Sequence, residues 1–155
     1  MEVSDYGEVI ATLEGLVKEL HTKAYKIVES HWMYIREMEG RLPGWENKSK
    51  LQVRCAKLEG NSIRVDWCEI KWYGSKAKGD RKSIRVHIVK PKGSHLYTLT
   101  KLKALARDWE AAKVEETEYR LSDIRREASH LVKAIISIRN ARLAATRNGK
   151  VEDRQ

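Results

Sequence analysis

The sequence lacks the features of a secreted or membrane-spanning protein. It has only two cysteines, Cys55 and Cys68, in 155 residues, too few for the disulfide framework of a small secreted domain. No apolar run approaches the ~20 residues that a membrane-spanning helix requires. The N-terminal residues are acidic and amphipathic and do not have the layout of a signal peptide. We therefore expect a cytoplasmic protein that does not contact a membrane.

Catalytic and metal-binding motifs are missing as well. The sequence contains no Walker-type phosphate loop, no Gly-x-Ser-x-Gly motif and no His-Glu-x-x-His motif. The residues Cys55, Cys68, His87 and His95 would have to come from separate segments to bind zinc, and the short Cys-x2-Cys spacing of zinc sites is absent. We therefore expect no enzymatic activity, no metal and no cofactor.

Acidic residues are scarce in the middle third of the chain, although the whole chain has a net charge of only +9. Residues 1–47 have a net charge of −4, and residues 108–155 have a net charge of +1. Residues 48–107 contain sixteen Lys or Arg and four Asp or Glu, a net charge of +12. A positive field that is concentrated in one segment is typical of a nucleic-acid-binding protein, and less often of one that binds an anionic membrane surface.

Apolar residues recur at alternating steps of three and four from residue 4 to about residue 39, which predicts a long helix with a heptad seam. Ser4 or Asp5 can cap its start, and Gly40, Pro43 and Gly44 end it. One seam residue, His31, is expected to be a hydrogen-bonded core histidine or to lie at the edge of the seam, rather than to bind a metal. The seam consists of Tyr6, Ile10, Leu13, Val17, Leu20, Ala24, Ile27, His31, Tyr34 and Met38.

No Gly or Pro interrupts residues 95–147, so this part of the chain is free to be helical. The apolar series changes phase near residues 110–113, which predicts a short helix at about 98–109 and a long one at about 112–147, with a frayed tail at 148–155. The long helix has a matching seam: Val114, Thr117, Leu121, Ile124, Ala128, Leu131, Ile135 and Ile138. Its acids Glu115, Glu116 and Glu118 are expected to form a solvated face.

Two matching seams in one chain favour antiparallel packing of the two long helices within the molecule. The alternative is that part of a seam forms a homodimer or binds a partner protein. A dimer would double the basic surface and could match two half-sites on DNA.

Between the helices the apolar period changes to two, which predicts three strands. Leu51, Val53 and Cys55 would face inward in the first strand. In the second, the inward set changes from Ile63, Val65 and Trp67 to Cys68, Ile70 and Trp72, which indicates a β-bulge or a strand that leaves its sheet. In the third, the inward residues would be Ile84, Val86 and Ile88.

These elements predict an α+β fold in a single domain, residues 1–155. Two long helices, one N-terminal (1–42) and one C-terminal, would pack antiparallel. A three-stranded antiparallel β-meander (50–92) and one short helix lie between them in the sequence, and the sheet would cap or flank one end of the pair. The short and the long C-terminal helices occupy 98–147. Such a meander has one polar face.

The connection between the second and third strands, residues 74–82, is longer than the two to five residues that a tight hairpin needs. We call it the wing loop. Its basic residues are Lys76, Lys78, Arg81 and Lys82. Strand alternation adds Arg54, Arg64, Lys71, Arg85 and His87 on the polar face, and Lys90 and Lys92 follow the third strand.

Basic loops often serve only solubility, but the segregation of charge in this chain favours a polyanion ligand. We expect the wing loop to hold phosphates and Arg54, Arg64 and Arg85 to reach base edges, because the Arg side chain matches the acceptor pair of guanine. Trp72, at the base of the loop, is expected to pack rather than to stack on bases.

The segments "VRCAKLEGNSIRVDWCEIKWYGSKAKG" (53–79) and "YTLTKLKALARDWEAAKVEETEYRLSDIRREASHLVKAIISIRNA" (97–141) resemble the MobI-type auxiliary (mobilisation) proteins of conjugative plasmids and integrative conjugative elements. The resemblance implies a small cytoplasmic protein that helps to start DNA transfer at a transfer origin, without catalysis, alongside a separate relaxase. The expected ligand is duplex DNA. The alternatives are an RNA-binding module, which needs exposed aromatic residues on the sheet, and a helical adaptor that recruits a partner protein.

Overall fold

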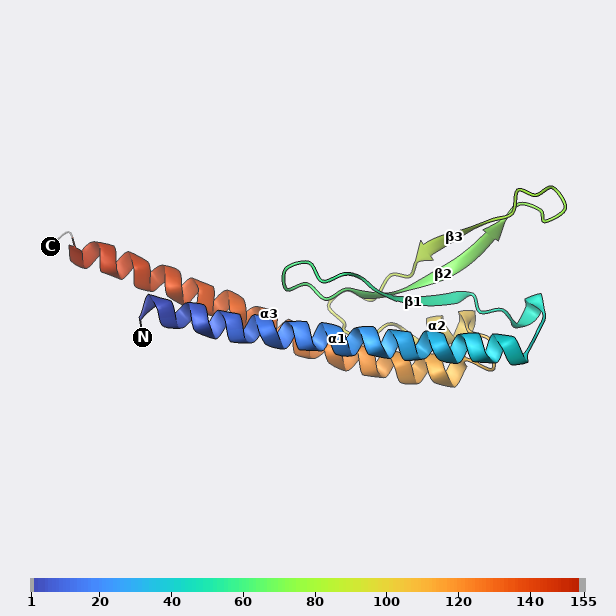
Figure 1. Cartoon of the computed structure of the whole chain (residues 1–155), viewed down its shortest axis with the longest axis horizontal. Helices are drawn as coiled ribbons and strands as arrows, with labels where there is room; N and C mark the ends of the chain where they lie inside the picture. The colour runs from blue at the N-terminus through green and yellow to red at the C-terminus, as the bar shows by residue number, and fades with distance from the viewer. Residues whose placement is uncertain (1, 154–155) are drawn as a thin grey trace.

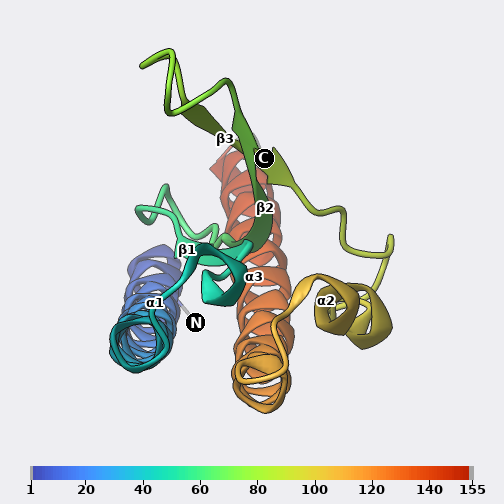
Figure 2. The same cartoon turned by 90° about the vertical axis from the view of Figure 1, so that its right-hand side faces the viewer.

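The computed structural model describes residues 2–153 and confirms the α+β fold. A long helix α1 (Val3–Arg41) and a long helix α3 (Ala111–Asp153) lie side by side and antiparallel (Figure 1). A three-stranded sheet covers the end of this pair where α1 stops and α3 starts, and the short helix α2 (Leu99–Leu105) lies beside α3 (Figure 2). No helix in residues 2–153 combines the length and the apolar character needed to cross a membrane.

The two seams pack against each other as predicted. Val17 and Ala24 of α1 and Val114 and Leu121 of α3 are fully buried. His31 is buried among them, with its Nδ1 atom 2.8 Å from the hydroxyl oxygen of Thr117. Burial, together with the positive charge of Lys113, lowers the pKa of His31 to about 4. The prediction of a hydrogen-bonded core histidine is therefore confirmed.

The helix ends differ slightly from the predicted ones. Helix α1 begins at Val3, where the carboxylate of Asp5 accepts a hydrogen bond of 2.8 Å from the backbone N–H of Glu2. Helix α3 continues to Asp153, so the prediction of a frayed tail is wrong for residues 148–153. Residues 154–155 lie outside the described part of the chain.

The strands β1 (Leu51–Cys55), β2 (Val65–Tyr73) and β3 (Lys82–His87) form an antiparallel sheet in the order β1-β2-β3. The register of both pairs is continuous, so the change of phase in β2 is not a bulge. The phase changes at Cys68, which still pairs with Gln52 of β1; β2 passes beyond the end of β1 after Glu69 and then leaves the helices (Figure 2). Ile84 runs beside this outer part and is 47% exposed, so its predicted inward position is wrong. Ile63 lies before β2 rather than in it.

A buried carboxylate joins the sheet to α3. Glu118 is fully buried and accepts hydrogen bonds from the Trp67 indole (2.8 Å), the backbone N–H of Tyr97 (2.8 Å) and the Arg125 guanidinium (2.8 Å). Arg125 also donates to the backbone carbonyl of Val65 (2.9 Å). The prediction of a solvated acidic face is wrong at Glu118, because this position of α3 faces the sheet rather than water.

Candidate nucleic-acid interface

The outer half of the β2–β3 hairpin projects away from the helices (Figures 1 and 2). Strand β1 pairs with β2 only as far as Glu69, so beyond this residue β3 is the only strand beside β2. Trp72 and Tyr73 are 40% and 53% exposed in this part, whereas Trp67 near the start of β2 is fully buried. We call residues 69–86, including the wing loop, the arm. It is a two-stranded ribbon held at one end by the body of the molecule.

The wing loop is ordered by its single acidic residue. The carboxylate of Asp80 accepts a hydrogen bond of 2.8 Å from the backbone N–H of Ser75, and the N–H of Lys78 donates to the carbonyl of Ser75 (3.2 Å). Gly74 has a φ of 81°, and a Cβ atom there would lie 2.4 Å from the carbonyl oxygen of Asp80. The loop therefore requires glycine at its entry, and its acid bonds to the backbone rather than to a lysine or arginine.

The basic residues named from the sequence form no salt bridge with any side chain that the structure describes. Within residues 2–153, the salt bridges of the molecule lie on the helices, and none involves the eleven predicted binding residues. Nine of the eleven are exposed, and Arg81 and Lys90 are half-buried. The eleven are Arg54, Arg64, Lys71, Lys76, Lys78, Arg81, Lys82, Arg85, His87, Lys90 and Lys92. Their positive charge is thus available to an anionic ligand.

The strand register shows which of these residues share a face. Arg54, Arg85 and His87 lie on one face of the sheet, as predicted. Lys71 pairs across the strands with Ile84 and lies on the opposite face, together with Lys82, so its predicted position on the polar face is wrong. The physical reason is that β2 keeps a regular register, and a strand without a bulge continues its alternation. The arm therefore carries basic side chains on both faces as well as at its tip.

Five of the predicted residues lie outside the arm: Arg54 in β1, His87 at the end of β3, and three on connecting segments. Arg64 precedes β2, at the opposite end of that strand from the wing loop. Lys90 and Lys92 follow β3 on the way to α2, and the Lys90 ammonium donates a hydrogen bond to the backbone carbonyl of Ser94. The structure does not bring these residues together with the wing loop.

Two exposed tryptophans meet next to the wing loop, and sequence reasoning missed their contact. Trp45, in the short 3-10 helix η1 (Trp45–Asn47), is 48% exposed, and its ring centroid lies 5.2 Å from that of Trp72 in an edge-on arrangement. The Arg81 guanidinium carbon lies 3.7 Å from the Trp45 centroid and 5.2 Å from that of Trp72. The Lys48 ammonium lies 5.2 Å from both. Trp72 thus packs on another ring, as expected, but is not buried.

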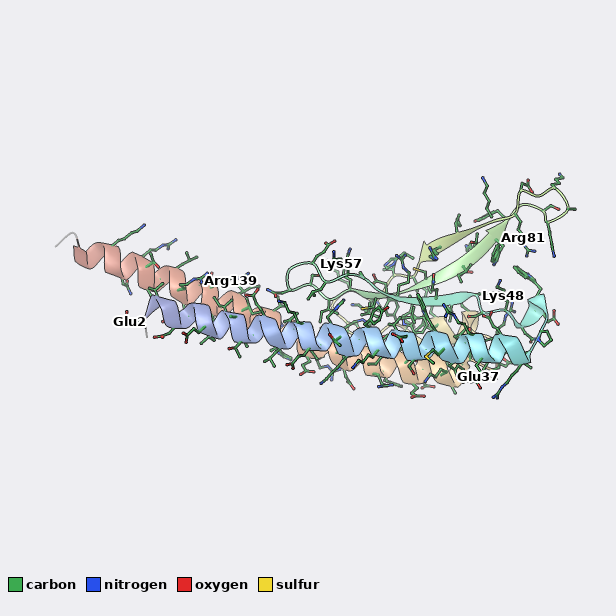
Figure 3. All side chains as sticks on the ribbon, viewed as in Figure 1. Glu2, Glu37, Lys48, Lys57, Arg81 and Arg139 are labelled. Carbon is green, nitrogen blue, oxygen red and sulfur yellow. The ribbon has the colours of Figure 1, made fainter. Side chains whose placement is uncertain are left out.

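A groove of ≈ 340 Å³ opens beside this pair. It has one acidic residue among four basic ones, and Figure 3 shows Lys48 and Arg81 at the same end of the molecule. The only sequence signal for it was a tryptophan followed closely by lysines in "GWENKSK" (44–50). The lining residues are Trp45, Lys48, Ser49, Lys50, Glu69, Ile70, Lys71, Trp72, Tyr73 and Arg107.

The comparisons with known proteins gave one match. A family model described as "MobI protein" matches residues 20–139, which include most of α1, the whole sheet with the arm, and α3 as far as Arg139. No curated protein matches the chain. No solved structure matches it either.

Proposed function

The chain belongs to the MobI family, and from this premise we propose that it is a non-catalytic DNA-binding accessory protein in the initiation of conjugative DNA transfer at an origin of transfer. Family membership supports an accessory role associated with mobilisation. The proposed partners are duplex DNA and a relaxase or another transfer protein. The proposed site of action is the cytoplasm, where the free thiols of Cys55 and Cys68 would stay reduced.

The observation that carries the DNA proposal is the arm with its unpaired cations. A two-stranded β-ribbon fits the major groove of B-DNA. Arg85 on one face and Lys71 on the other would then meet the two walls of the groove, while the wing loop contacts phosphates. The Arg85 guanidinium donates a hydrogen bond to the side-chain oxygen of Gln52, which holds it on the face it shares with Arg54. These two arginines are the candidates for contacts with base edges.

The test replaces the four wing-loop cations, Lys76, Lys78, Arg81 and Lys82, with alanine and measures binding to a 20-bp duplex by fluorescence anisotropy over a range of salt concentrations. Each lost phosphate contact lowers the slope of log affinity against log salt by about 0.9. Loss of all four contacts would therefore lower the slope by roughly 3.6.

A matched control removes the same charge from the helices. Lys18, Lys23, Lys26 and Lys133 are exposed on α1 and α3, and replacing them with alanine also lowers the net charge by four. This control should keep most of the slope, because its cations lie away from the arm. If the slope of log affinity against log salt fell by the same amount in both variants, only the net charge would matter and the arm would not be the contact.

The RNA-binding alternative is favoured by one observation, the exposed rings of Trp45 and Trp72 next to cations. Competition of a labelled DNA duplex with unlabelled DNA duplex, single-stranded DNA and RNA separates the two functions. RNA that displaces the duplex better than DNA does would favour the alternative.

A further inference from the structure

We propose that the groove beside Trp45 and Trp72 binds unpaired bases of single-stranded DNA that continues from the duplex held by the arm. This inference rests on the proposed function and adds a second ligand class, a junction between duplex and single strand. A site for such a junction needs a surface on which bases can stack, cations next to that surface, and a direct connection between that surface and the arm.

The stacking surface is the pair of tryptophan rings. Aromatic rings that serve only packing are normally buried, yet Trp45 is 48% exposed and Trp72 is 40% exposed. Gly44, at the start of η1, has a φ of 125°, and a Cβ atom there would lie 2.5 Å from the Glu46 carboxylate. The turn that presents Trp45 therefore depends on glycine. Every base has a face that stacks on such rings, so this contact does not depend on sequence.

The cations next to the rings match the phosphates that flank a stacked base. The Lys48 ammonium and the Arg81 guanidinium lie over both rings. The Arg107 guanidinium donates a hydrogen bond of 2.8 Å to the backbone carbonyl of Lys48, which fixes the segment that carries this lysine. Glu69 is the one acid among the lining residues. The groove thus combines a stacking surface with a positive rim, which is the usual design of single-strand-binding sites.

The groove adjoins the arm directly, because residues 69–73 of the arm form part of its lining. Arg81 of the wing loop also covers Trp45. Paired bases are stacked inside a duplex and cannot place their faces on a protein ring, whereas an unpaired strand can. A duplex on the arm and an unpaired strand in the groove would therefore meet near Arg81. This arrangement fits a fork or a strand end better than it fits continuous duplex.

The experiment uses the full chain with Trp45→Leu and Trp72→Leu together, and it compares a blunt 20-bp duplex with the same duplex carrying a single-stranded dT10 tail. The wild type should bind the tailed duplex more tightly than the blunt one. Because each base that stacks on an aromatic ring contributes to the affinity, the ratio of the affinities for tailed and blunt duplex should be about tenfold lower in the double variant. Its affinity for the blunt duplex should fall by a much smaller factor. The tail should also quench the tryptophan fluorescence of the wild type, and the variant should lose most of that quenching.

A control variant, Tyr25→Leu with Tyr119→Leu, removes two exposed aromatic rings from the helices, at 54% and 49% exposure. It should keep the full advantage of the tail. A U10 tail on the same duplex tests whether the single strand is DNA, and tighter binding of the U10 tail would overturn the assignment in favour of RNA.

The outcomes separate this inference from the proposed function. If the tail gives no advantage, or if the double variant keeps it, the groove is not a base-stacking site, although duplex binding through the arm still stands. If the double variant loses affinity for blunt and tailed duplexes equally, the tryptophans only position the arm and the inference is overturned. If the wild type binds neither duplex, the proposed function itself fails.

Discussion

The two ends of strand β2 differ in burial. The strand starts in the body of the molecule, which consists of the helices and the part of the sheet that packs on them, and it ends in the arm. At the start of β2, Val65 and Trp67 are buried against the helices, while at its end Trp72 and Tyr73 are largely exposed. The body pairs the buried charge of Glu118 with Arg125, whereas the cations of the arm have no acidic partner within residues 2–153. The difference indicates that the body provides the stability, and it is the basis of the proposal that a ligand supplies the missing negative charge at the arm.

The largest effect should come from the buried ion pair of the body. Glu118→Ala leaves the Arg125 guanidinium, the Trp67 indole N–H and the Tyr97 backbone N–H without their shared acceptor. Breaking such a buried pair costs about 3–5 kcal/mol of the free energy of unfolding, which chemical denaturation can measure. The neighbouring Glu116→Ala is the control. Its carboxylate is 59% exposed, and its removal should cost less than about 1 kcal/mol. Equal costs would show that Glu118 is not part of the core.

The next effect locates the boundary between body and arm. Ile88→Ala should cost about 2–4 kcal/mol, because this side chain is 8% exposed and belongs to the core cluster. Ile84→Ala, four residues earlier on the same side of the strand and 47% exposed, should cost less than about 1 kcal/mol. Thermal or denaturant unfolding of the two variants measures both. A large loss for Ile84→Ala would mean that its side chain is covered in solution, and the arm would then not be open on both faces.

The third effect is a pH dependence that arises in the body. The pKa of His31 is about 4 in the folded protein and 6.5 ordinarily, so between these values the unfolded chain binds a proton that the folded chain does not. Stability should therefore fall as the pH falls from about 6.5 to about 4, by up to about 1.4 kcal/mol per pH unit. Denaturation at several pH values should show a shallower loss for His31→Gln than for the wild type. Parallel curves would show that His31 takes up its proton equally in both states.

The contribution of Glu110 to stability changes with pH in the opposite sense to that of His31. The effect of His31 must therefore be measured as the difference between the wild type and His31→Gln, and not from the wild type alone. Burial raises the pKa of the Glu110 carboxyl, whose Oε2 atom has no hydrogen-bond partner in the part of the chain that the structure describes, and whose Oε1 accepts a hydrogen bond from Ser49. A raised pKa means that its contribution is present below the ordinary value of 4.5 and is lost as the pH rises through the folded value. His31→Gln leaves this contribution in place.

The sequence predicts the body better than the arm, for a physical reason. Helical seams such as Val17–Ala24 and Val114–Leu121 repeat over many turns, so periodicity identifies both the helices and their buried faces. Strand alternation assigns an inner and an outer face only where a layer covers the sheet. Ile84 follows the alternation of its strand, but it is exposed because the helices do not cover this part of the sheet. The periodicity of one strand carries no information about where the covering helices end.

The wrong prediction at Glu118 and the missed contact of Trp45 also have physical causes. Glu118 lies in a run of acids, but it is one helical turn after Val114 and one turn before Ser122, both of which are buried. This spacing of four residues places Glu118 on the same helix face as Val114, which indicated from the sequence that the position faces the sheet. The contact between Trp45 and Trp72 joins residues 27 positions apart through a turn and an unpaired strand edge. No local pattern encodes such a contact, so the groove could not be predicted.

The central claim is that the arm, rather than the helical body, contacts DNA. The most direct measurement is a titration of the 18.0 kDa protein with a 20-bp duplex, followed residue by residue through its backbone amide NMR signals. The largest shifts should fall on residues 69–86. Shifts concentrated instead on the outer faces of α1 and α3, around Lys23 and Arg120 for example, with the arm unchanged, would contradict the account.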